Sequence, residues 1–461
     1  MRLSAATAPG RGPGSVGIVH LGIGAFHRAH QAVYTEDAAL ASGEDHWGIC
    51  GVTLRSADVA DRLRPQDGLY TVVERGPGAA PPRVVRAVRE VLDGSSAGWA
   101  VPDRIADPRV HVVTLTVTEK GYRHGPDGRL RLDDPEVAAD LRGRAAPTTV
   151  VGRLAAGLVR RAAADAGPLS VLSCDNLPSN GELLRDLVAQ YLDAARAPDG
   201  LLARVRFPST MVDRIVPATT AADVAAEEER TGLRDEALVV AEPFRQWVIE
   251  DGLAAEHPDW AAAGAVLVRD VRPWELLKLR ILNASHTLLA LLGLRCGYAT
   301  IAEAATDPML HAAARRLVLD DAVPVLAGPE GVDPVAYADT VLARFTNPAL
   351  RHTTMQVAQD TSQKLGPRLL DGAPRAGLPA RWSALVVAAW LGHALDPRDA
   401  AGVPIALDDP LAADLAGARS PEEALAVLPD LPPAFRSEVL TAHRRLAGSP
   451  VAGVVKEMLD G

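Results

Sequence analysis

The sequence predicts an α/β domain with a mostly parallel sheet, followed by an all-α domain. The first half alternates short apolar, β-branched runs with helical stretches, which is the pattern of βαβ units. The first of these runs, Val16-Gly-Ile-Val-His-Leu21, leads directly into a glycine-rich turn. From Pro273 onward the pattern is helical, with Pro and Gly gathered between the helices. We therefore predict two domains, residues 1–270 and residues 271–461.

Each predicted element follows from its local pattern. Apolar runs predict strands at residues 16–21, 47–54, 110–117 and 169–173. The stretch 27–41 is rich in Ala and has no proline, so it predicts a helix. Later helices are predicted at residues 274–293, 301–318, 334–345, 348–364, 380–395 and 436–446. The segments 76–84 and 144–148 are rich in Gly, Pro and Ala and predict surface loops.

The composition excludes several classes of protein. The chain has 461 residues, with 48 Lys and Arg against 58 Asp and Glu, so the formal net charge is −10. Binding to nucleic acid or to an anionic membrane favours clustered basic residues, and neither partner is expected here. The three cysteines, Cys50, Cys174 and Cys296, form no CxxC pair and no disulfide framework. This cysteine usage fits a reducing compartment.

Targeting segments are not expected either. The first residues, Met1 to Gly14, have no hydrophobic signal core. The apolar stretch from Ile281 to Leu294 is interrupted by Asn283, Ser285 and His286, so it does not predict a membrane span. We expect a soluble cytoplasmic protein.

The turn Gly22-Ile-Gly24-Ala25-Phe26 follows the first strand and opens a helix. Such a turn lets the backbone approach a pyrophosphate, which the helix N-terminus stabilises. The third glycine of the usual fingerprint is absent, because position 27 is His. Taken alone, the turn is equally compatible with an ordinary strand–turn–helix corner.

Asp58 follows the second predicted strand, where an acidic residue can accept a hydrogen bond from an adenosine ribose. Its charge would favour NAD over NADP, although Arg55 nearby would tolerate a 2′-phosphate. The alternative for Asp58 is a solvated helix N-cap.

The stretch from Trp274 to His286 carries a set of polar groups suited to ketone–alcohol chemistry. At about 100° per residue, Glu275, Lys278, Asn283 and His286 fall on one face within about 140°. A desolvated lysine can act as general base, and an amide can donate to a carbonyl oxygen that gains charge. The alternative is a surface helix with a solvated polar face and an apolar stripe opposite.

Other chemistries lack their motifs. The 12 histidines form no HExxH and no zinc-like Cys/His spacing. His27 and His30 follow the glycine turn and are interpreted as packing or phosphate-proximal groups. No GxSxG is present for a serine nucleophile. A catalytic metal is therefore not expected.

A series of segments spans nearly the whole chain in the order found in one known family. They are His20-Leu-Gly-Ile-Gly-Ala-Phe-His-Arg-Ala-His-Gln31, Thr114-Leu-Thr-Val-Thr-Glu-Lys-Gly-Tyr122, Ser173-Cys-Asp-Asn176 with Asn180-Gly181, Met211-Val-Asp-Arg-Ile215, Glu242-Pro-Phe-Arg-Gln-Trp-Val-Ile-Glu-Asp251 and Lys278-x4-Asn283-x2-His286. Together they resemble the polyol-specific long-chain dehydrogenases, the family of mannitol dehydrogenase and fructuronate reductase. The resemblance implies a Rossmann-type N-terminal domain, a helical C-terminal domain, NAD as cofactor and a monomer.

The resemblance also implies roles for single residues. Lys278 resembles the family's catalytic lysine, a base in alcohol oxidation and an acid in ketone reduction. Asn176 and Asn283 match the paired amides that hold the reacting oxygen. The remaining implied roles are substrate orientation for His286, contact with substrate hydroxyls for Asp213, proton transfer to solvent for Glu119 and Glu275, and NAD binding for Gly22, Gly24, Ala25, Phe26 and Asp58.

Without the resemblance, three of these residues have ordinary explanations. Asn176 would be a turn residue, Asp213 a partner for Arg214, and Glu119 a loop carboxylate.

The choice between a polyol and a uronate depends on fixed cations, since a carboxylate favours a bidentate arginine. Lys120 stands where a mannitol enzyme has Gly, and Arg245 where it has an apolar residue. The segment from Asn347-Pro-Ala-Leu-Arg351-His352 to Ser362-Gln-Lys364 resembles the fructuronate reductase type. We therefore assign Lys120, Arg245, Arg351 and His352 to substrate binding; the alternative is that the three cations are surface charges or packing partners. Thr361 replaces an expected glycine, which predicts an altered turn or a narrower site.

The sequence thus predicts a metal-independent, NAD-dependent enzyme that interconverts D-fructuronate and D-mannonate. Two alternatives stay open. One is a mannitol 2-dehydrogenase or another polyol dehydrogenase. The other is a non-catalytic nucleotide or sugar sensor, against which the presence of Lys278, Asn283 and His286 argues.

Overall fold

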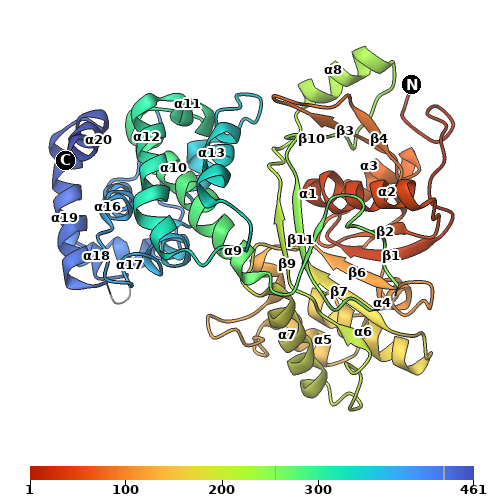
Figure 1. Ribbon diagram of the computed structural model, residues 1–461. Helices are drawn as coiled ribbons and strands as arrows, with labels where there is room; N and C mark the ends of the chain where they lie inside the picture. The colour runs from red at the N-terminus through yellow and green to blue at the C-terminus, as the bar shows by residue number, and fades with distance from the viewer. Residues whose placement is uncertain (255, 429–430) are drawn as a thin grey trace. The chain divides into compact units, whose positions relative to one another are not determined.

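The computed structural model describes residues 1–254, 256–428 and 431–461. The chain divides into two compact units, Met1–Arg272 and Pro273–Gly461, here called the N-terminal unit and the C-terminal unit. Most of their helices and strands are labelled in Figure 1.

The N-terminal unit contains all the strands in the described residues. They are β1 (Val16–Leu21), β2 (Gly48–Thr53), β3 (Tyr70–Glu74), β4 (Arg83–Val85), β5 (Val88–Asp93), β6 (Val112–Leu115), β7 (Leu169–Ser173), β8 (Val205–Arg206), β9 (Thr210–Asp213), β10 (Val239–Ala241), β11 (Gln246–Glu250) and β12 (Val266–Val268). The helices of this unit are α1 (Ala25–Ala29), α2 (Gln31–Ser42), α3 (Asp58–Leu63), α4 (Ala100–Ile105), α5 (Pro135–Leu141), α6 (Val150–Ala163), α7 (Asn180–Ala194) and α8 (Ala221–Thr231), with short 3-10 turns η1 (Arg64–Gln66) and η2 (Glu119–Tyr122). The helix α9 (Arg272–Leu277) begins at the last residue of the unit.

A parallel sheet of six strands forms the centre of the N-terminal unit. Its order is β5-β2-β1-β6-β7-β8, and every neighbouring pair is parallel. This order is the one found in doubly wound dinucleotide-binding sheets, in which ligands bind beyond the carboxyl ends of the strands where the order reverses. Here the reversal lies between β1 and β6.

Both faces of this sheet are covered, which explains why its inner strands are mostly apolar. One face packs side chains such as Val19 and Val113 against α4, α6 and α7. The other packs Ile18 and Val112 against α1, α2 and the two smaller sheets. Figure 1 shows α1 and α2 on one side of the sheet and α6 and α7 on the other.

Two three-stranded sheets complete the N-terminal unit. They have the orders β10-β3-β4 and β12-β11-β9. The second brings β9, which ends at Asp213, next to β11, with Gln246 opposite Asp213.

In the described residues of the C-terminal unit, all the named secondary-structure elements are helical. Its elements are η3 (Lys278–Asn283), α10 (Ala284–Cys296), α11 (Ile301–Thr306), α12 (Pro308–Arg316), η4 (Leu317–Ala322), η5 (Val323–Val325), α13 (Pro334–Phe345), α14 (Thr354–Ala358), α15 (Thr361–Leu365), η6 (Gly366–Leu370), α16 (Arg381–Leu395), α17 (Ala412–Leu415), α18 (Pro421–Leu425), α19 (Pro433–Gly448) and α20 (Val451–Asp460). The segments η3, η4 and η6 are π-helical. Helices α10 and α16 are buried on nearly all sides, as expected for helices that are apolar all round.

The predicted fold class is confirmed, because a parallel-sheet α/β unit precedes an all-α unit. The strands at 16–21 and 169–173 and the helix at 334–345 have the predicted bounds.

Other predicted elements are interrupted. The predicted helix 27–41 is broken at His30, whose φ of −123° and ψ of −89° separate α1 from α2. The predicted helix 348–364 is wrong before Thr354 and breaks again at Asp360, which has a left-handed φ of +50°.

Among the residues that the structure describes, no helix combines the length and apolar character that a membrane crossing requires.

Candidate active site

The glycine turn lies at the carboxyl end of β1, beside the point where the strand order reverses. Gly22 has a φ of +99°, and a Cβ there would lie 2.1 Å from the carbonyl oxygen of Thr116, which follows β6. Position 22 therefore requires glycine for both conformation and space. Gly24 is the N-cap of α1 and has no side chain to cap it, so the first amides of α1 are left to other acceptors. Ala25 and Phe26 are half-buried in this first turn.

The residue in place of the third glycine belongs to the packing beneath the turn. The His27 ring stacks on that of His20, with centroids 3.4 Å apart, and both side chains are fully buried. Nδ1 of His20 bonds with Thr114 Oγ1 at 2.7 Å, and its Nε2 lies 2.9 Å from Thr116 Oγ1. Burial lowers the pKa of His20 to about 3 and that of His27 well below its ordinary value, so both rings are neutral at physiological pH.

Asp58 lies at the same edge of the sheet as the turn. β1 and β2 run parallel, with Leu21 beside Val52, so their carboxyl ends are adjacent. Asp58 is the exposed first residue of α3, and its carboxylate accepts from Ser56 Oγ at 3.1 Å. It is in the first helical turn rather than at the N-cap, which is Ala57.

Glu119, Lys120 and Asn176 are exposed at the ends of neighbouring strands. Glu119 and Lys120 lie on η2 after β6, and Asn176 follows β7, which pairs with β6. Between them, the carboxylate of Asp175 accepts hydrogen bonds from Val117 N, Thr118 N and the Tyr122 hydroxyl. The structure thus brings these three predicted residues to one edge of the sheet.

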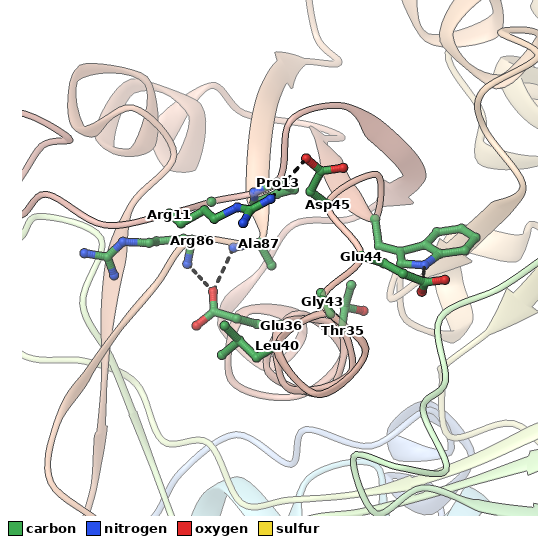
Figure 2. A pocket seen from close by; sticks show the side chains of 13 residues that line it. Arg11, Pro13, Thr35, Glu36, Leu40, Gly43, Glu44, Asp45, Arg86 and Ala87 are labelled. Atoms are coloured by element: carbon green, nitrogen blue, oxygen red, sulfur yellow. Dashed lines mark hydrogen bonds and ion pairs between the residues drawn. The ribbon is translucent and has the colours of Figure 1, made fainter.

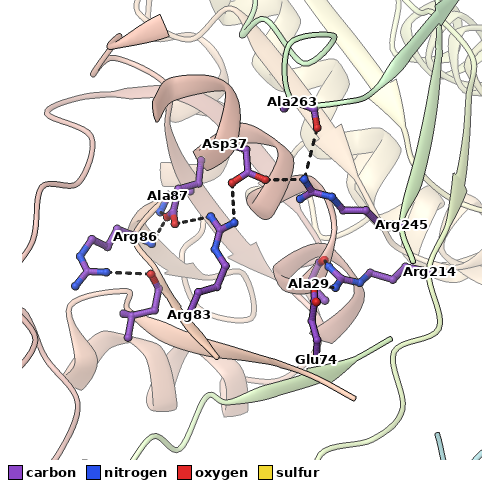
Figure 3. A network of polar contacts seen from close by, with 11 residues as sticks. Ala29, Asp37, Glu74, Arg83, Arg86, Ala87, Arg214, Arg245 and Ala263 are labelled. Atoms are coloured by element: carbon purple, nitrogen blue, oxygen red, sulfur yellow. Dashed lines mark hydrogen bonds and ion pairs between the residues drawn. The ribbon is translucent and has the colours of Figure 1, made fainter. Parts of the chain in front are cut away.

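Asp213 is buried at the end of β9. Its neighbour Arg214, also buried, pairs with Glu74 at 2.6 Å and donates to the Glu242 carbonyl at 2.7 Å and to the Ala29 carbonyl (Figure 3). Glu74 is thus an ion-pair partner of Arg214. The contacts of Arg214 link the end of β9 to α1 and to β3.

Arg245 has protein partners on both sides of its guanidinium. It donates to Asp37 at 2.7 Å, and its guanidinium carbon lies 4.4 Å from the centre of the Tyr34 ring. Asp37 also accepts from Arg83 at 2.6 Å, as Figure 3 shows. These contacts match the alternative interpretation of Arg245 as a packing partner.

A pocket of about 220 Å³ in the N-terminal unit is lined by none of the predicted site residues. It is bordered by Arg11 and Pro13, by Leu40 of α2, and by Asp45 before β2 (Figure 2). Pro13 precedes β1 and Asp45 precedes β2, so the pocket lies at the amino ends of strands whose carboxyl ends carry the glycine turn and Asp58.

In the C-terminal unit, Lys278 begins the π-helical segment η3, and Asn283 ends it. The α-helical angles used for this stretch are therefore wrong. A π turn holds more residues than an α turn, so positions five apart lie closer to a common face than in an α-helix. Lys278 is 8% exposed, which contradicts a solvated polar face at that residue. The apolar side chains of this stretch are buried, namely Leu277, Ile281, Ala284 and Leu288.

His286 lies in a basic and aromatic environment. Its ring stacks on Phe345 and meets the His352 ring edge-on, with centroids 4.8 Å apart in each case. Burial lowers the pKa of His286 well below its ordinary value, and the positive charges of Arg368, Lys364 and Arg344 add to the effect. The His286 imidazole is therefore neutral, and its Nε2 has no hydrogen-bond partner among the described residues.

Two of these cations are held by backbone or hydroxyl groups. Arg368 donates to Thr287 Oγ1 at 2.8 Å, one turn from Asn283. Lys364 donates to the Val357 carbonyl at 3.2 Å, at the end of α14. Arg344 and Arg368 were not predicted from the sequence: Arg344 lies three residues before, and Arg368 four residues after, the segment from Asn347 to Lys364 that was singled out.

Arg351 and His352 were both predicted to bind substrate, but they differ in exposure. His352 is half-buried beside His286, and Arg351 is exposed. Thr361 opens α15, fully buried, and its hydroxyl donates to the Ala358 carbonyl at 2.7 Å. The left-handed residue of this turn is Asp360, so the helical position 361 does not require glycine.

Known proteins resemble the chain along most of its length. The family model described as Mannitol dehydrogenase Rossmann domain matches residues 16–262, and that of the Mannitol dehydrogenase C-terminal domain matches residues 270–429. The uncharacterized oxidoreductase YdfI of Escherichia coli strain K12 is 45% identical over 413 residues, covering 86% of this chain and 82% of the relative. The D-mannonate oxidoreductase of the same organism is 41% identical over 410 residues, covering 86% and 83%.

A solved structure agrees in fold as well. Pseudomonas fluorescens mannitol 2-dehydrogenase, in a ternary complex with NAD and D-mannitol, has a TM-score of 0.86 and 34% identity, with 100% of both chains covered. The chain therefore belongs to the mannitol dehydrogenase family and is an oxidoreductase that acts on CH–OH groups.

Proposed function

We propose that the protein interconverts D-fructuronate and D-mannonate, with NAD as the cofactor. A uronate differs from a polyol of the same length in its carboxylate, so the choice depends on fixed positive charge. The observation that supports a uronate is the basic environment of His286, to which Arg368, Lys364 and Arg344 contribute. The similarity to a D-mannonate oxidoreductase supports it independently.

NAD fits the N-terminal unit on two observations. The sheet has the strand order of dinucleotide-binding folds, and the Cβ-free surface of Gly22 and Gly24 lies beside its reversal point. Gly22, Gly24, Ala25 and Phe26 would hold the pyrophosphate, and Asp58 the adenosine ribose. When bound, NAD accepts or supplies the hydride.

The proposed chemistry of the C-terminal unit centres on Lys278. In the reducing direction its ammonium donates a proton to the carbonyl oxygen of the substrate, and in oxidation its amine removes the hydroxyl proton. Asn283 donates an amide N–H to the same oxygen as negative charge develops. Neutral His286 donates or accepts one further hydrogen bond to orient the sugar, and Glu275 passes the proton of Lys278 toward solvent.

Three residues of the N-terminal unit keep their predicted roles in this proposal. Asn176 binds the reacting oxygen, Asp213 contacts substrate hydroxyls, and Glu119 takes part in proton transfer. Monomeric state, metal independence and the lack of nucleic-acid or membrane partners are also part of the proposal.

A mannitol 2-dehydrogenase is the second candidate. It is favoured by the fungal mannitol 2-dehydrogenases among the relatives, such as that of Pyrenophora tritici-repentis at 36% identity.

One assay separates these candidates. Oxidation of NADH is measured with D-fructuronate and with D-fructose, for the wild type and for Lys278→Ala, in buffer with and without EDTA. We expect turnover of fructuronate, unaffected by EDTA, and a loss of about 100-fold or more in kcat for Lys278→Ala. Turnover of fructose alone would refute the uronate proposal. Tight NADH binding without turnover of either substrate would instead indicate a sensor.

A further inference from the structure

Asp175, which is half-buried, joins the ends of the strands that carry the predicted catalytic residues of the N-terminal unit. Its Oδ1 accepts from Val117 N and Thr118 N, each at 2.9 Å, and its Oδ2 accepts from the Tyr122 hydroxyl at 2.6 Å. Because the Tyr122 hydroxyl donates to Asp175, it accepts from Ser173 Oγ, also at 2.6 Å. Three donors thus converge on one carboxylate.

This carboxylate fixes the segment that carries Glu119 and Lys120. Thr118 has a φ of +67°, a strained conformation that non-glycine residues rarely adopt. Two hydrogen bonds to Asp175, one at Thr118 N itself and one at the preceding amide, hold the backbone there. The fully buried ring of Tyr122 anchors the other end of η2. Glu119 and Lys120 are therefore exposed on a short turn that is fixed at both ends.

The backbone of Asp175 is linked to a third strand through Asn180. The side-chain nitrogen Nδ2 of Asn180 donates to the Asp175 carbonyl at 2.9 Å and to the Thr210 carbonyl at 2.8 Å. Its amide oxygen accepts from Thr210 N at 2.9 Å. Thr210 opens β9, which ends at Asp213. Asn180 itself is fully buried.

We propose that Asp175 is a positioning residue. It fixes the position of Glu119 through the backbone amides of the preceding residues, and it fixes its own neighbour Asn176. Asn180 links both to β9 and so to Asp213. The proposal rests on the proposed function, because it assumes that Glu119, Asn176 and Asp213 act on substrate. Asp175 acts through these groups and through no contact with the reacting atoms.

The junction depends on charge-assisted hydrogen bonds to both oxygens of Asp175. Asparagine has the same shape but is neutral, and with its oxygen toward the backbone amides its NH2 group would donate to the Tyr122 hydroxyl, which would then donate to Ser173 Oγ. The hydrogen bonds from Val117 N and Thr118 N lose the charge of their acceptor and are weakened. Since misplacement of a reacting group by about 1 Å can cost about 100-fold in rate, catalysis is expected to suffer more than folding.

The test compares Asp175→Asn with a matched carboxylate. Asp140 also accepts from two backbone amides and two hydroxyls, those of Thr148 and Thr149 at the start of α6, neither of which is a predicted site residue. We expect Asp175→Asn to lower kcat by about 10- to 100-fold with the KM for NADH unchanged. Asp140→Asn is expected to lower the thermal midpoint and leave kcat unchanged. Tyr122→Phe removes one of the three donors and is expected to lower kcat less than Asp175→Asn.

Hydrogen exchange provides a readout that needs no substrate. In Asp175→Asn the amides of Val117 and Thr118 are expected to exchange faster than in the wild type, while those of Thr148 and Thr149 exchange as before. Unchanged exchange at Val117 and Thr118, or an unchanged kcat, would overturn the proposal. So would an equal loss of kcat in Asp140→Asn. Rates are taken on whichever substrate the wild type turns over, so a failure with fructuronate refutes the proposed function without deciding on Asp175.

Discussion

Arg245 and Arg351 were both predicted to bind a substrate carboxylate, and their surroundings differ. The guanidinium of Arg245 is paired with Asp37 and stacked on Tyr34. A substrate carboxylate would have to compete with Asp37 for the same donors. Arg351 is exposed, and its neighbour His352 reaches the ring of His286. Of the two arginines, Arg351 is therefore the better test of the uronate proposal.

For Arg351→Leu we expect a higher KM for fructuronate and an unchanged KM for fructose. The loss of a charge-assisted hydrogen bond to a carboxylate corresponds to about 1.5–3 kcal/mol, or about a 10- to 150-fold change in KM. Steady-state kinetics with both substrates measure it. Arg316→Leu serves as the control, because it removes an exposed arginine at the end of α12, which pairs with Asp320 in η4. An equal rise of KM for both substrates would remove Arg351 from the carboxylate site.

Single residues show how far the sequence could lead at this scale. Asn176 was singled out by its motif, and Asp175 stands directly before it, yet only the structure reveals the three donors on Asp175. These donors come from residues more than 50 positions away in the sequence, and no local sequence pattern predicts such a contact. The same holds for Arg245, whose partner Asp37 is 208 positions distant.

At the scale of elements, the two glycines of the turn differ in what requires them, although the motif contains both. Gly22 is required by the fold itself, because of its positive φ and its approach to Thr116. Gly24 has a φ of −82°, and a Cβ there would have its nearest neighbour at 3.8 Å. The fold therefore leaves room for a side chain at position 24.

This difference predicts opposite outcomes for two alanine variants. Gly22→Ala should lower the thermal midpoint, since a left-handed residue with a backbone clash destabilises by more than about 1 kcal/mol. Gly24→Ala should leave the midpoint unchanged and weaken NADH binding, because a phosphate needs the space. Thermal melts and fluorescence titration with NADH check both. Unchanged NADH affinity in Gly24→Ala would argue against a pyrophosphate at this turn.

Elements were predictable where the local pattern decides them. β1 and β7 are short apolar runs bounded by turn residues, and their bounds follow from the sequence. The π turn at Lys278–Asn283 does not, because a helical projection assumes a constant angle per residue. The break at His30 likewise depends on packing against Gln246 and Trp247, distant in sequence.

At the scale of the whole molecule, one buried carboxyl links stability to pH. Burial raises the pKa of Asp321 in η4 to about 6, and its Oδ2 accepts from Ser383 N at 2.6 Å. The pKa of the Asp321 carboxyl is higher in the folded protein than in the unfolded chain, so the unfolded chain loses the carboxyl proton at a lower pH. The contribution of Asp321 to stability is thus greatest below about pH 4 and is lost as pH rises to about 6.

Asp321→Asn should therefore stabilise the protein above pH 6. A shift of about two pKa units corresponds to at most about 3 kcal/mol, or several degrees in the thermal midpoint. Melting curves at pH 5 and pH 7.5 measure the difference, which should be larger at pH 7.5. Asp320→Asn is the control, since Asp320 pairs with Arg316 and accepts from Trp382. A variant without any gain at pH 7.5 would show that the burial of Asp321 carries no free-energy cost there.

The margins of the central sheet carry a consequence for the behaviour of the chain in concentrated solution. An unpaired strand invites a strand of another molecule, and long, flat, apolar edges lead to aggregation. Here one margin is β8, only two residues long and ending in the exposed Arg206. The other is β5, where the exposed Arg89 interrupts the apolar side chains. A sheet buried on both faces thus has an exposed charged side chain at each open side and little length at one of them, which opposes fibril-like growth from these sides.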